Sequence, residues 1–147
     1  MSLWVDLLGA ETRFAGRRWR TRVCTAGAPD APALLLLHGT GGHLENWARN
    51  IMPLAREFRV IAPDFLWHGL SQCEPFDPRI VPSLVDQVAD LMDDLGIASA
   101  AIEGQSMGGW VAMQFALSHP ERVGALVLTT TQGYVPDEGA VPGYAEP

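Results

Sequence analysis

The stretch from Ala100 to Gly109 constrains the fold most, because it reads as a buried strand, a tight turn and the start of a helix. The turn carries Gly104-Gln105-Ser106-Met107-Gly108, which fits the pattern G-x-S-x-G. A serine on a sharp strand-to-helix turn holds its hydroxyl above the sheet edge, where a base can take its proton. The glycines are needed because a Cβ there would strike the neighbouring strand or helix. The following helix presents free backbone N–H groups to a developing oxyanion, so the stretch predicts a nucleophilic serine.

Strand and helix patterns alternate along the rest of the chain. We expect a two-strand entry over residues 11–25, then four strands at 33–37, 58–62, 98–103 and 123–128. Amphipathic or apolar helices are expected at 44–56, 83–95 and 107–118, the first interrupted by Pro53. This order predicts an α/β fold with a doubly wound, mostly parallel sheet of six strands. Residues 1–130 would form this core, and residues 131–147 an irregular C-terminal tail.

Three unusual loops follow strands of the predicted sheet. They are His38–Gly42, Asp64–Ser71 and the turn around Ser106. The carboxyl ends of parallel strands meet at one edge of a sheet, and ligands bind there in doubly wound folds. The convergence of the three loops therefore predicts a site for a small-molecule substrate.

Composition excludes several other classes of protein. The chain has 147 residues, 48% of them hydrophobic, and a formal net charge of −7, which argues against disorder and against a nucleic-acid partner. The two cysteines lack metal-site spacing, and no dinucleotide or P-loop motif occurs, so we expect no metal and no cofactor. No apolar run approaches the length of a membrane span and no export signal is visible, so a cytoplasmic location and no membrane partner are expected.

The charged residues have simple structural interpretations. All ten basic residues are arginines, and Arg18, Arg20 and Arg22 alternate as on a strand with one solvent-facing side. A patch that binds anions is the alternative for this cluster. Asp90, Asp93 and Asp94 are expected to form a solvated helix face rather than a metal site.

Four motifs together resemble the α/β-hydrolase family. They are His38-Gly39 after a leucine-rich strand, Pro63-Asp64 followed by His68-Gly69-Leu70-Ser71, Gly104 to Gly109, and Ser118 to Val123. In order they cover residues 33–130, which is similar to the N-terminal half of that family's fold, its first six strands without a lid. The details look most like the branch of meta-cleavage-product hydrolases, which split carbon–carbon bonds in dienoate diketones, and of esterases.

The resemblance implies a role for each residue of the site. Ser106 would be the nucleophile, and the backbone N–H groups of Thr40 and Met107 would hold the oxyanion. The expected substrate-binding residues are Gly39, Gly41, Trp67 and Gln105. The substrate would be an ester or a compound with a carbon–carbon bond next to a ketone. Serine at the elbow argues against haloalkane dehalogenase and epoxide hydrolase chemistry, which use a carboxylate nucleophile.

The rest of a catalytic triad is missing from the expected places. The family order is serine, acid, histidine, yet only His119 follows Ser106, about 18 Å away along a helix. His38 and His68 are expected to pin loops, and His43 has no special role. Asp137 and Glu138 lie where some family members keep the acid.

Two interpretations therefore stay open. In the first, the chain is a serine hydrolase that is incomplete, with the C-terminal half of the fold missing. In the second, it is a non-catalytic truncated fragment or a scaffold that binds a ligand or partner. In either case the strand over residues 123–128 would leave an apolar edge unpaired, so a homo-oligomer is expected.

Overall fold

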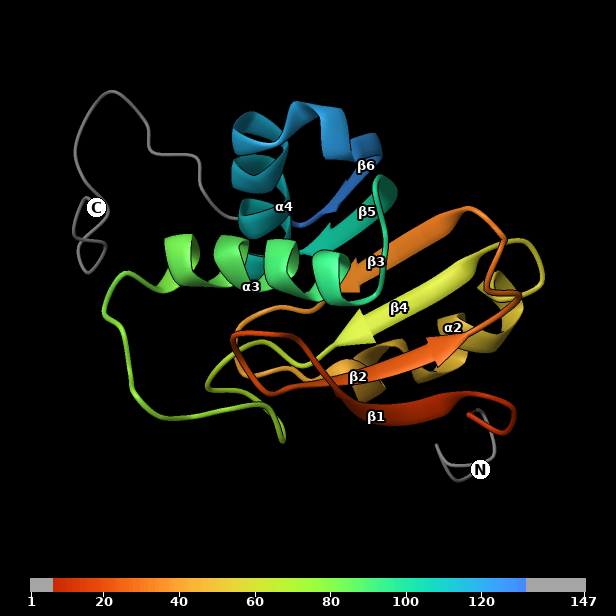
Figure 1. Cartoon of the computed structure of the whole chain (residues 1–147), viewed down its shortest axis with the longest axis horizontal. Helices are drawn as coiled ribbons and strands as arrows, with labels where there is room; N and C mark the ends of the chain where they lie inside the picture. Colours follow the sequence, from red (N-terminus) through yellow and green to blue (C-terminus); the bar gives the residue numbers. More distant parts are fainter. Residues whose placement is uncertain (1–6, 132–147) are drawn as a thin grey trace.

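The computed structural model describes residues 7–131, and six strands within them form a single sheet. The strands are β1 (Glu11–Ala15), β2 (Thr21–Ala26), β3 (Ala33–Leu37), β4 (Arg59–Pro63), β5 (Ala100–Gln105) and β6 (Val123–Thr129). Their order in the sheet is β1-β2-β4-β3-β5-β6, shown in Figure 1. The first two strands run antiparallel to their neighbours, and β3 to β6 run parallel to one another. The prediction of a mostly parallel six-stranded sheet is confirmed.

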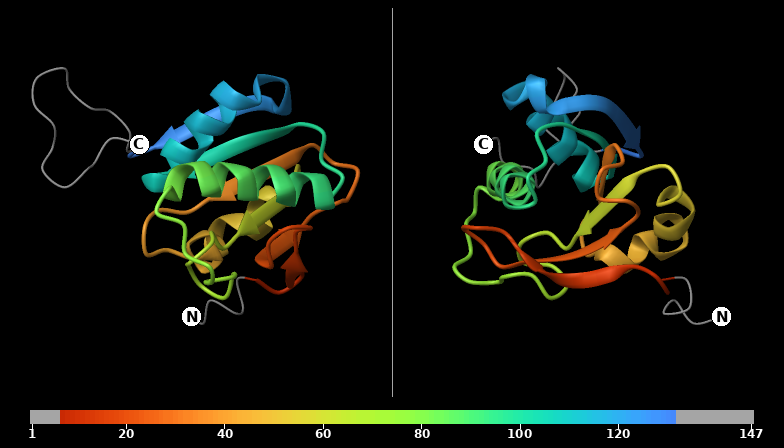
Figure 2. Two further views of the ribbon diagram at one scale, coloured as in Figure 1. Left: turned by 60° about the vertical axis from the view of Figure 1, so that its left-hand side comes forward. Right: turned by 45° about the vertical axis from the view of Figure 1, so that its right-hand side comes forward.

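Helices cover both faces of this sheet. They are η1 (Leu44–Trp47), α2 (Ala48–Leu54), α3 (Ile80–Asp94), α4 (Met107–Ser118) and η2 (Pro120–Arg122). The long helices α3 and α4 lie on one face and α2 lies on the other, as the two views of Figure 2 show. Two separate clusters of buried apolar side chains follow from this arrangement, one on each face, so the sheet is doubly wound.

The central strand β3 supplies side chains to both clusters. Leu35 and Leu37 pack on the face of α3 and α4, and Leu34 and Leu36 pack on the face of α2. A fully buried leucine side chain contributes on the order of 2 kcal/mol to folding. An uninterrupted leucine run fits a strand with no solvent face, so the sequence pattern predicted β3 with its correct bounds.

Prolines explain the two largest differences in helix bounds. The helix expected over residues 44–56 is a 3₁₀ turn, η1, followed by the short helix α2, which ends one residue after Pro53. Proline lacks an N–H and its ring crowds the preceding turn, so the helix does not continue to residue 56. Helix α3 begins at Ile80, three residues before the predicted start. Pro82 lies in its first turn, where a missing N–H breaks no helical hydrogen bond.

The prediction that Arg18, Arg20 and Arg22 lie on a strand with one solvent-facing side is wrong. Arg18 and Arg20 precede β2, and Arg22 is its second residue and is buried. β2 lies between β1 and β4, and five of its six residues are buried. A buried guanidinium needs charged partners, and Arg22 finds them in Asp64 and Glu45, which are far away in the sequence.

The aspartates of α3 also do more than face solvent. Asp90 accepts a hydrogen bond from the backbone N–H of Arg18 (3.0 Å), and Asp94 accepts one from that of Gly16 (2.9 Å). The carboxylates thereby attach the turn between β1 and β2 to the helix. Asp93 and Asp94 are exposed and Asp90 is half-buried, so the expected solvated face is present and in addition binds the turn.

Part of the expected C-terminal tail, residues 132–147, lies outside the described residues, and so do Asp137 and Glu138. Within residues 7–131, no helix combines the length and the apolar character that crossing a membrane would require.

Candidate active site

Ser106 occupies the sharp turn between β5 and α4. Its backbone adopts φ 54° and ψ −116°, a conformation that residues with a side chain rarely take. Such strain costs on the order of 1–3 kcal/mol and persists only where the surroundings enforce it. Here the N–H of Ser106 donates to the carbonyl of Thr129 (2.9 Å), and the carbonyl of Ser106 accepts from Gly109 (3.0 Å). The neighbouring strand and the first turn of α4 therefore hold the serine in place.

Glycines are required on both sides of the turn. A Cβ on Gly104 would lie 2.4 Å from the carbonyl oxygen of Gly108, and one on Gly108 would lie 2.2 Å from that of Leu37. No real Cβ approaches a backbone atom this closely. The predicted reason for the glycines, close packing of the turn against a strand and a helix, is confirmed.

The loop after β3 passes directly beside the serine. A Cβ on Gly39 would lie 3.7 Å from the Ser106 hydroxyl oxygen. The hydroxyl of Thr40 donates to the sulfur of Met107 (3.4 Å), so the two residues predicted to hold an oxyanion are in contact. Within the described residues, neither backbone N–H of this pair donates a hydrogen bond. Both N–H groups are free to bind a negatively charged oxygen next to Ser106.

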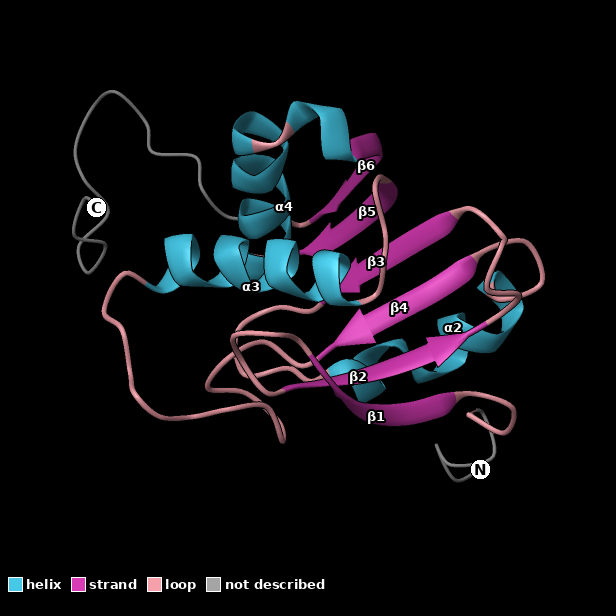
Figure 3. Cartoon of the chain, in the orientation of Figure 1, coloured by secondary structure: helices cyan, strands magenta, loops and turns pink. Residues whose placement is uncertain are grey.

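The other predicted substrate contacts divide into two groups. Gln105 and Gly41 are exposed on the loops that flank Ser106, and Gly41 has an open surrounding and a φ of 70°. Trp67 belongs to the loop after β4, where its Nε1 donates to the carbonyl of Pro75 (3.3 Å) and its ring packs edge-on against Phe76. In the sheet β3 lies between β4 and β5, so the loops after these three strands are neighbours at one edge. Figure 3 shows the three strands ending at a common edge.

His38 is held as a neutral structural residue. Its Nε2 accepts a hydrogen bond from the N–H of Phe65 (3.0 Å), so Nδ1 carries the proton and donates to the carbonyl of Gly39 (2.8 Å). Burial lowers the pKa of His38 to about 4, which keeps the ring neutral at pH 7. Since both nitrogens are engaged, His38 cannot take the proton of Ser106.

Within the described residues, the remaining three histidines contact groups other than Ser106. Nδ1 of His68 donates to the carbonyl of Leu66 (2.9 Å), and Nδ1 of His43 pairs with Glu45 (2.7 Å). His119 follows the far end of α4 and packs on the ring of Phe115. Within the described residues, no histidine hydrogen-bonds to the hydroxyl of Ser106.

An ion network beside the site was not predicted from the sequence. Asp64 is fully buried and accepts from the N–H groups of Leu44 (2.7 Å) and Leu70 (2.9 Å) and from Arg22 (3.2 Å). Arg22 also pairs with Glu45. Burial lowers the pKa of Arg22, but the hydrogen bonds and charges of Glu45 and Asp64 outweigh that effect and raise it above its usual value. A carboxylate directly after an apolar strand was the one signal in the sequence that pointed to this network.

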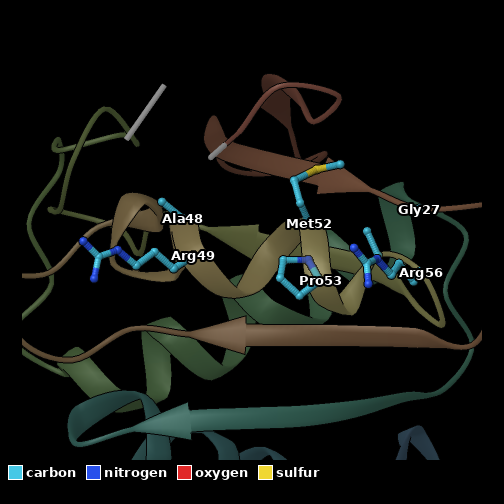
Figure 4. A pocket seen from close by; sticks show the side chains of 7 residues that line it. Gly27, Ala48, Arg49, Met52, Pro53 and Arg56 are labelled. Carbon is cyan, nitrogen blue, oxygen red and sulfur yellow. The ribbon is translucent and has the colours of Figure 1, made fainter. Parts of the chain in front are cut away.

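A hollow of about 670 Å³ lies along the outer side of α2 and is lined by Arg49, Met52, Pro53 and Arg56 among others (Figure 4). It faces away from α4 and takes no part in the arrangement around Ser106. Within the described residues, no group of three potential ligand side chains could hold a metal ion.

Comparison with known proteins places this geometry in a wider context. The sequence profile of the alpha/beta hydrolase fold matches residues 32–146. The chain is 39% identical over 130 residues to 2-hydroxymuconate semialdehyde hydrolase of Pseudomonas sp. (strain CF600), covering 86% of this chain and 44% of that protein. It is 38% identical over 120 residues to the dihydrolipoyllysine-residue acetyltransferase component of the acetoin cleaving system of Cupriavidus necator, covering 79% and 30%.

A solved structure is also similar to this chain over most of its length. The chain superimposes on 2-hydroxy-6-oxo-6-phenylhexa-2,4-dienoate hydrolase from Rhodococcus sp. strain RHA1 with a TM-score of 0.77 and 35% identity, covering 83% of this chain and 47% of that one. The chain therefore spans less than half the length of each of these three proteins.

Proposed function

The chain belongs to the α/β-hydrolase-fold family, and on this premise we propose that it acts as a serine hydrolase with Ser106 as its nucleophile. One observation carries the proposal: a strained turn holds Ser106 beside two backbone N–H groups, of Thr40 and Met107, that have no acceptor within the described residues. A fold that needed only a connection between β5 and α4 would have no reason to retain this strain.

The geometry supports attack on a carbonyl carbon. The Ser106 oxygen adds to that carbon as its proton passes to a base, and the π electrons of the carbonyl group move to its oxygen, which becomes negatively charged. The N–H groups of Thr40 and Met107 then stabilise this oxyanion, helped by the positive end of the α4 dipole at Met107. Loss of one such donor typically lowers the rate by a factor of about 100 to 1,000.

We propose an ester, or a carbon–carbon bond next to a ketone, as the bond that is split. Two of the compared proteins are named as hydrolases, one of a muconate semialdehyde and one of an oxo-phenyl-substituted dienoate. The paired rings of Trp67 and Phe76 supply apolar surface on the loop after β4. Gly39, Gly41 and Gln105 would contact the substrate nearer to the serine.

The proposal requires a base from another source. Within the described residues, none of the four histidines of the chain hydrogen-bonds to Ser106. We propose that the histidine comes from polypeptide beyond these 147 residues, in the same chain or in a second one, and that the acid comes from the same source or is Asp137 or Glu138. The greater length of the compared proteins is consistent with this source.

The lack of a hydrogen bond between Ser106 and any histidine of the described residues favours a second candidate function. Without a base, the site would bind a carbonyl compound or an anion and not turn it over. Loss of triad members leaves only a residual rate enhancement. A non-catalytic scaffold of this kind would keep the fold and the free N–H groups but not the reactivity of Ser106.

Labelling with a fluorophosphonate, read by intact mass, separates the two functions. The parent, studied in the longer chain or assembly that supplies the base, should gain one adduct, and Ser106→Ala in the same context should gain none. Ser118→Ala is the matched control, because this exposed serine at the other end of α4 hydrogen-bonds only to the carbonyl of Gln114. If that longer chain or assembly is folded and gains no adduct, an activated Ser106 is refuted and the scaffold is supported. A labelled parent would then be assayed with p-nitrophenyl acetate and with a dienoate ketone.

A further inference from the structure

We propose that Arg22 is a positioning residue for the oxyanion hole, holding the loop that carries Thr40 through the carboxylates of Asp64 and Glu45. The inference rests on the proposed function, since it gives a catalytic meaning to the position of that loop. Arg22 lies on β2, outside the three loops that meet at the site, and it touches neither Ser106 nor Thr40.

The guanidinium of Arg22 bridges two segments at the edge of the sheet. One of its nitrogens, Nη1, lies 3.2 Å from Asp64 Oδ2 and 3.2 Å from Glu45 Oε2, and the other, Nη2, binds Glu45 Oε1. The arginine side chain is 10% exposed, that of Glu45 is 15% exposed and that of Asp64 is fully buried. Asp64 directly follows β4, and Glu45 belongs to η1, which follows the loop with Thr40. The network therefore ties the start of η1 to the end of β4.

The two ends of the loop are attached to two adjacent residues, one end to Asp64 and the other to Phe65. At its C-terminal end, the N–H of Leu44 donates to Asp64 Oδ1 at 2.7 Å. At its N-terminal end, Nε2 of His38 accepts from the N–H of Phe65, the residue after Asp64. Thr40 and Gly41 between these anchors are exposed. The position of the Thr40 N–H thus depends on where Asp64 and Phe65 stand.

Charge and shape both make arginine necessary here. Without a cation, the carboxylates of Asp64 and Glu45 would repel each other in a largely buried place and push η1 away from β4. A lysine would restore the charge, but a single ammonium group cannot reproduce a planar fork that reaches two carboxylates in fixed directions. Arg22→Lys should therefore keep the fold and loosen the loop. A displacement of about 1 Å at a catalytic group can lower a rate about 100-fold.

The test compares Arg22→Lys with Arg18→Lys in the full chain. Arg18 is the matched control because it lies next to the same hairpin and its ion pair with Asp86 is exposed on both sides. Fluorophosphonate labelling is measured over a range of probe concentrations, which separates the maximal labelling rate from the apparent dissociation constant of the probe. Amide hydrogen exchange is followed at Leu44 and, as a reference far from the site, at Ile97, whose N–H binds the carbonyl of Met92.

In Arg22→Lys we expect the maximal labelling rate to fall about 10- to 100-fold with an unchanged apparent dissociation constant, and exchange to accelerate at Leu44 but not at Ile97. Arg18→Lys should behave like the parent. A parental labelling rate in Arg22→Lys, or equal acceleration at both amides, overturns the inference. If the parent itself gains no label, the proposed function fails separately. Exchange at Leu44 then decides whether Arg22 holds the loop.

Discussion

Replacing Gly108 with alanine should destabilise the fold by about 3 kcal/mol, the upper end of the usual cost of overpacking a core. The added Cβ would stand 2.2 Å from the carbonyl oxygen of Leu37 and 2.6 Å from that of His38. Both neighbours are backbone atoms of fully buried residues, so no flexible side chain can move aside. Relief requires α4 to move away from β3 by about 1 Å, which loosens packing along the whole helix.

Urea unfolding measures this cost. With a slope of about 2 kcal/mol per molar urea, the midpoint should fall by about 1.5 M. The matched control is Gly124→Ala on β6, where the new Cβ would meet nothing closer than 3.7 Å. That variant should be neutral or more stable by about 0.5 kcal/mol, because alanine lowers the entropy of the unfolded chain. A Gly108→Ala midpoint within about 0.3 M of the parent would refute the claim that the turn is packed directly on β3.

The other predictions concern pH, strain and association. The pKa of His38 is about 4 in the fold against the usual 6.5, so the stabilisation by the neutral ring is present above pH 6.5 and is lost as the pH falls toward 4. Unfolding free energies at pH 7 and pH 4.5 should differ by about 2.5 kcal/mol more in the parent than in His38→Gln, and equal differences would contradict a buried His38 ring with a lowered pKa. The free energy of unfolding of Ser106→Gly should exceed that of the parent by about 1 kcal/mol, because glycine accepts a positive φ without strain. The variant should gain no fluorophosphonate adduct, and a variant less stable than the parent would argue against strain at the turn. Val127 on β6 is 51% exposed, and we propose that this edge mediates self-association. Light scattering should show an oligomer that Val127→Lys reduces to a monomer, and a monomeric parent at micromolar concentration would contradict it.

Sequence patterns alone predicted the elements whose conformation depends mainly on neighbouring residues in the chain. The leucine run of β3 and the apolar helix from Met107 to Ser118 were predicted with their correct bounds, because each is flanked by glycine or proline and has a uniform environment. The turn at Ser106 and its glycines were likewise evident, since their spacing alone defines the strand-to-helix connection. The order of strands and helices was enough to predict a doubly wound sheet.

The interior of the site could not be predicted in the same way. Arg22 looked like one of several solvent-facing arginines, and it is buried because β2 lies beside β4 and brings it to Asp64, 42 residues away. The tautomer of His38 is fixed by the N–H of Phe65, 27 residues away. The sequence around Arg22 or His38 contains no pattern that indicates this partner.

The amino-acid sequence by itself thus determined the class of fold, the place of Ser106 at its turn and the loops that surround it, because these follow from periodicity and from glycine spacing. Only the tertiary structure decided which charges are buried, which histidines are engaged and how the loop with Thr40 is held. These features depend on side chains from β2, η1 and the loop after β4 that meet only when the sheet has assembled. The free energy of a buried ion or hydrogen bond depends on its partner, and that partner is chosen by the packing of the strands.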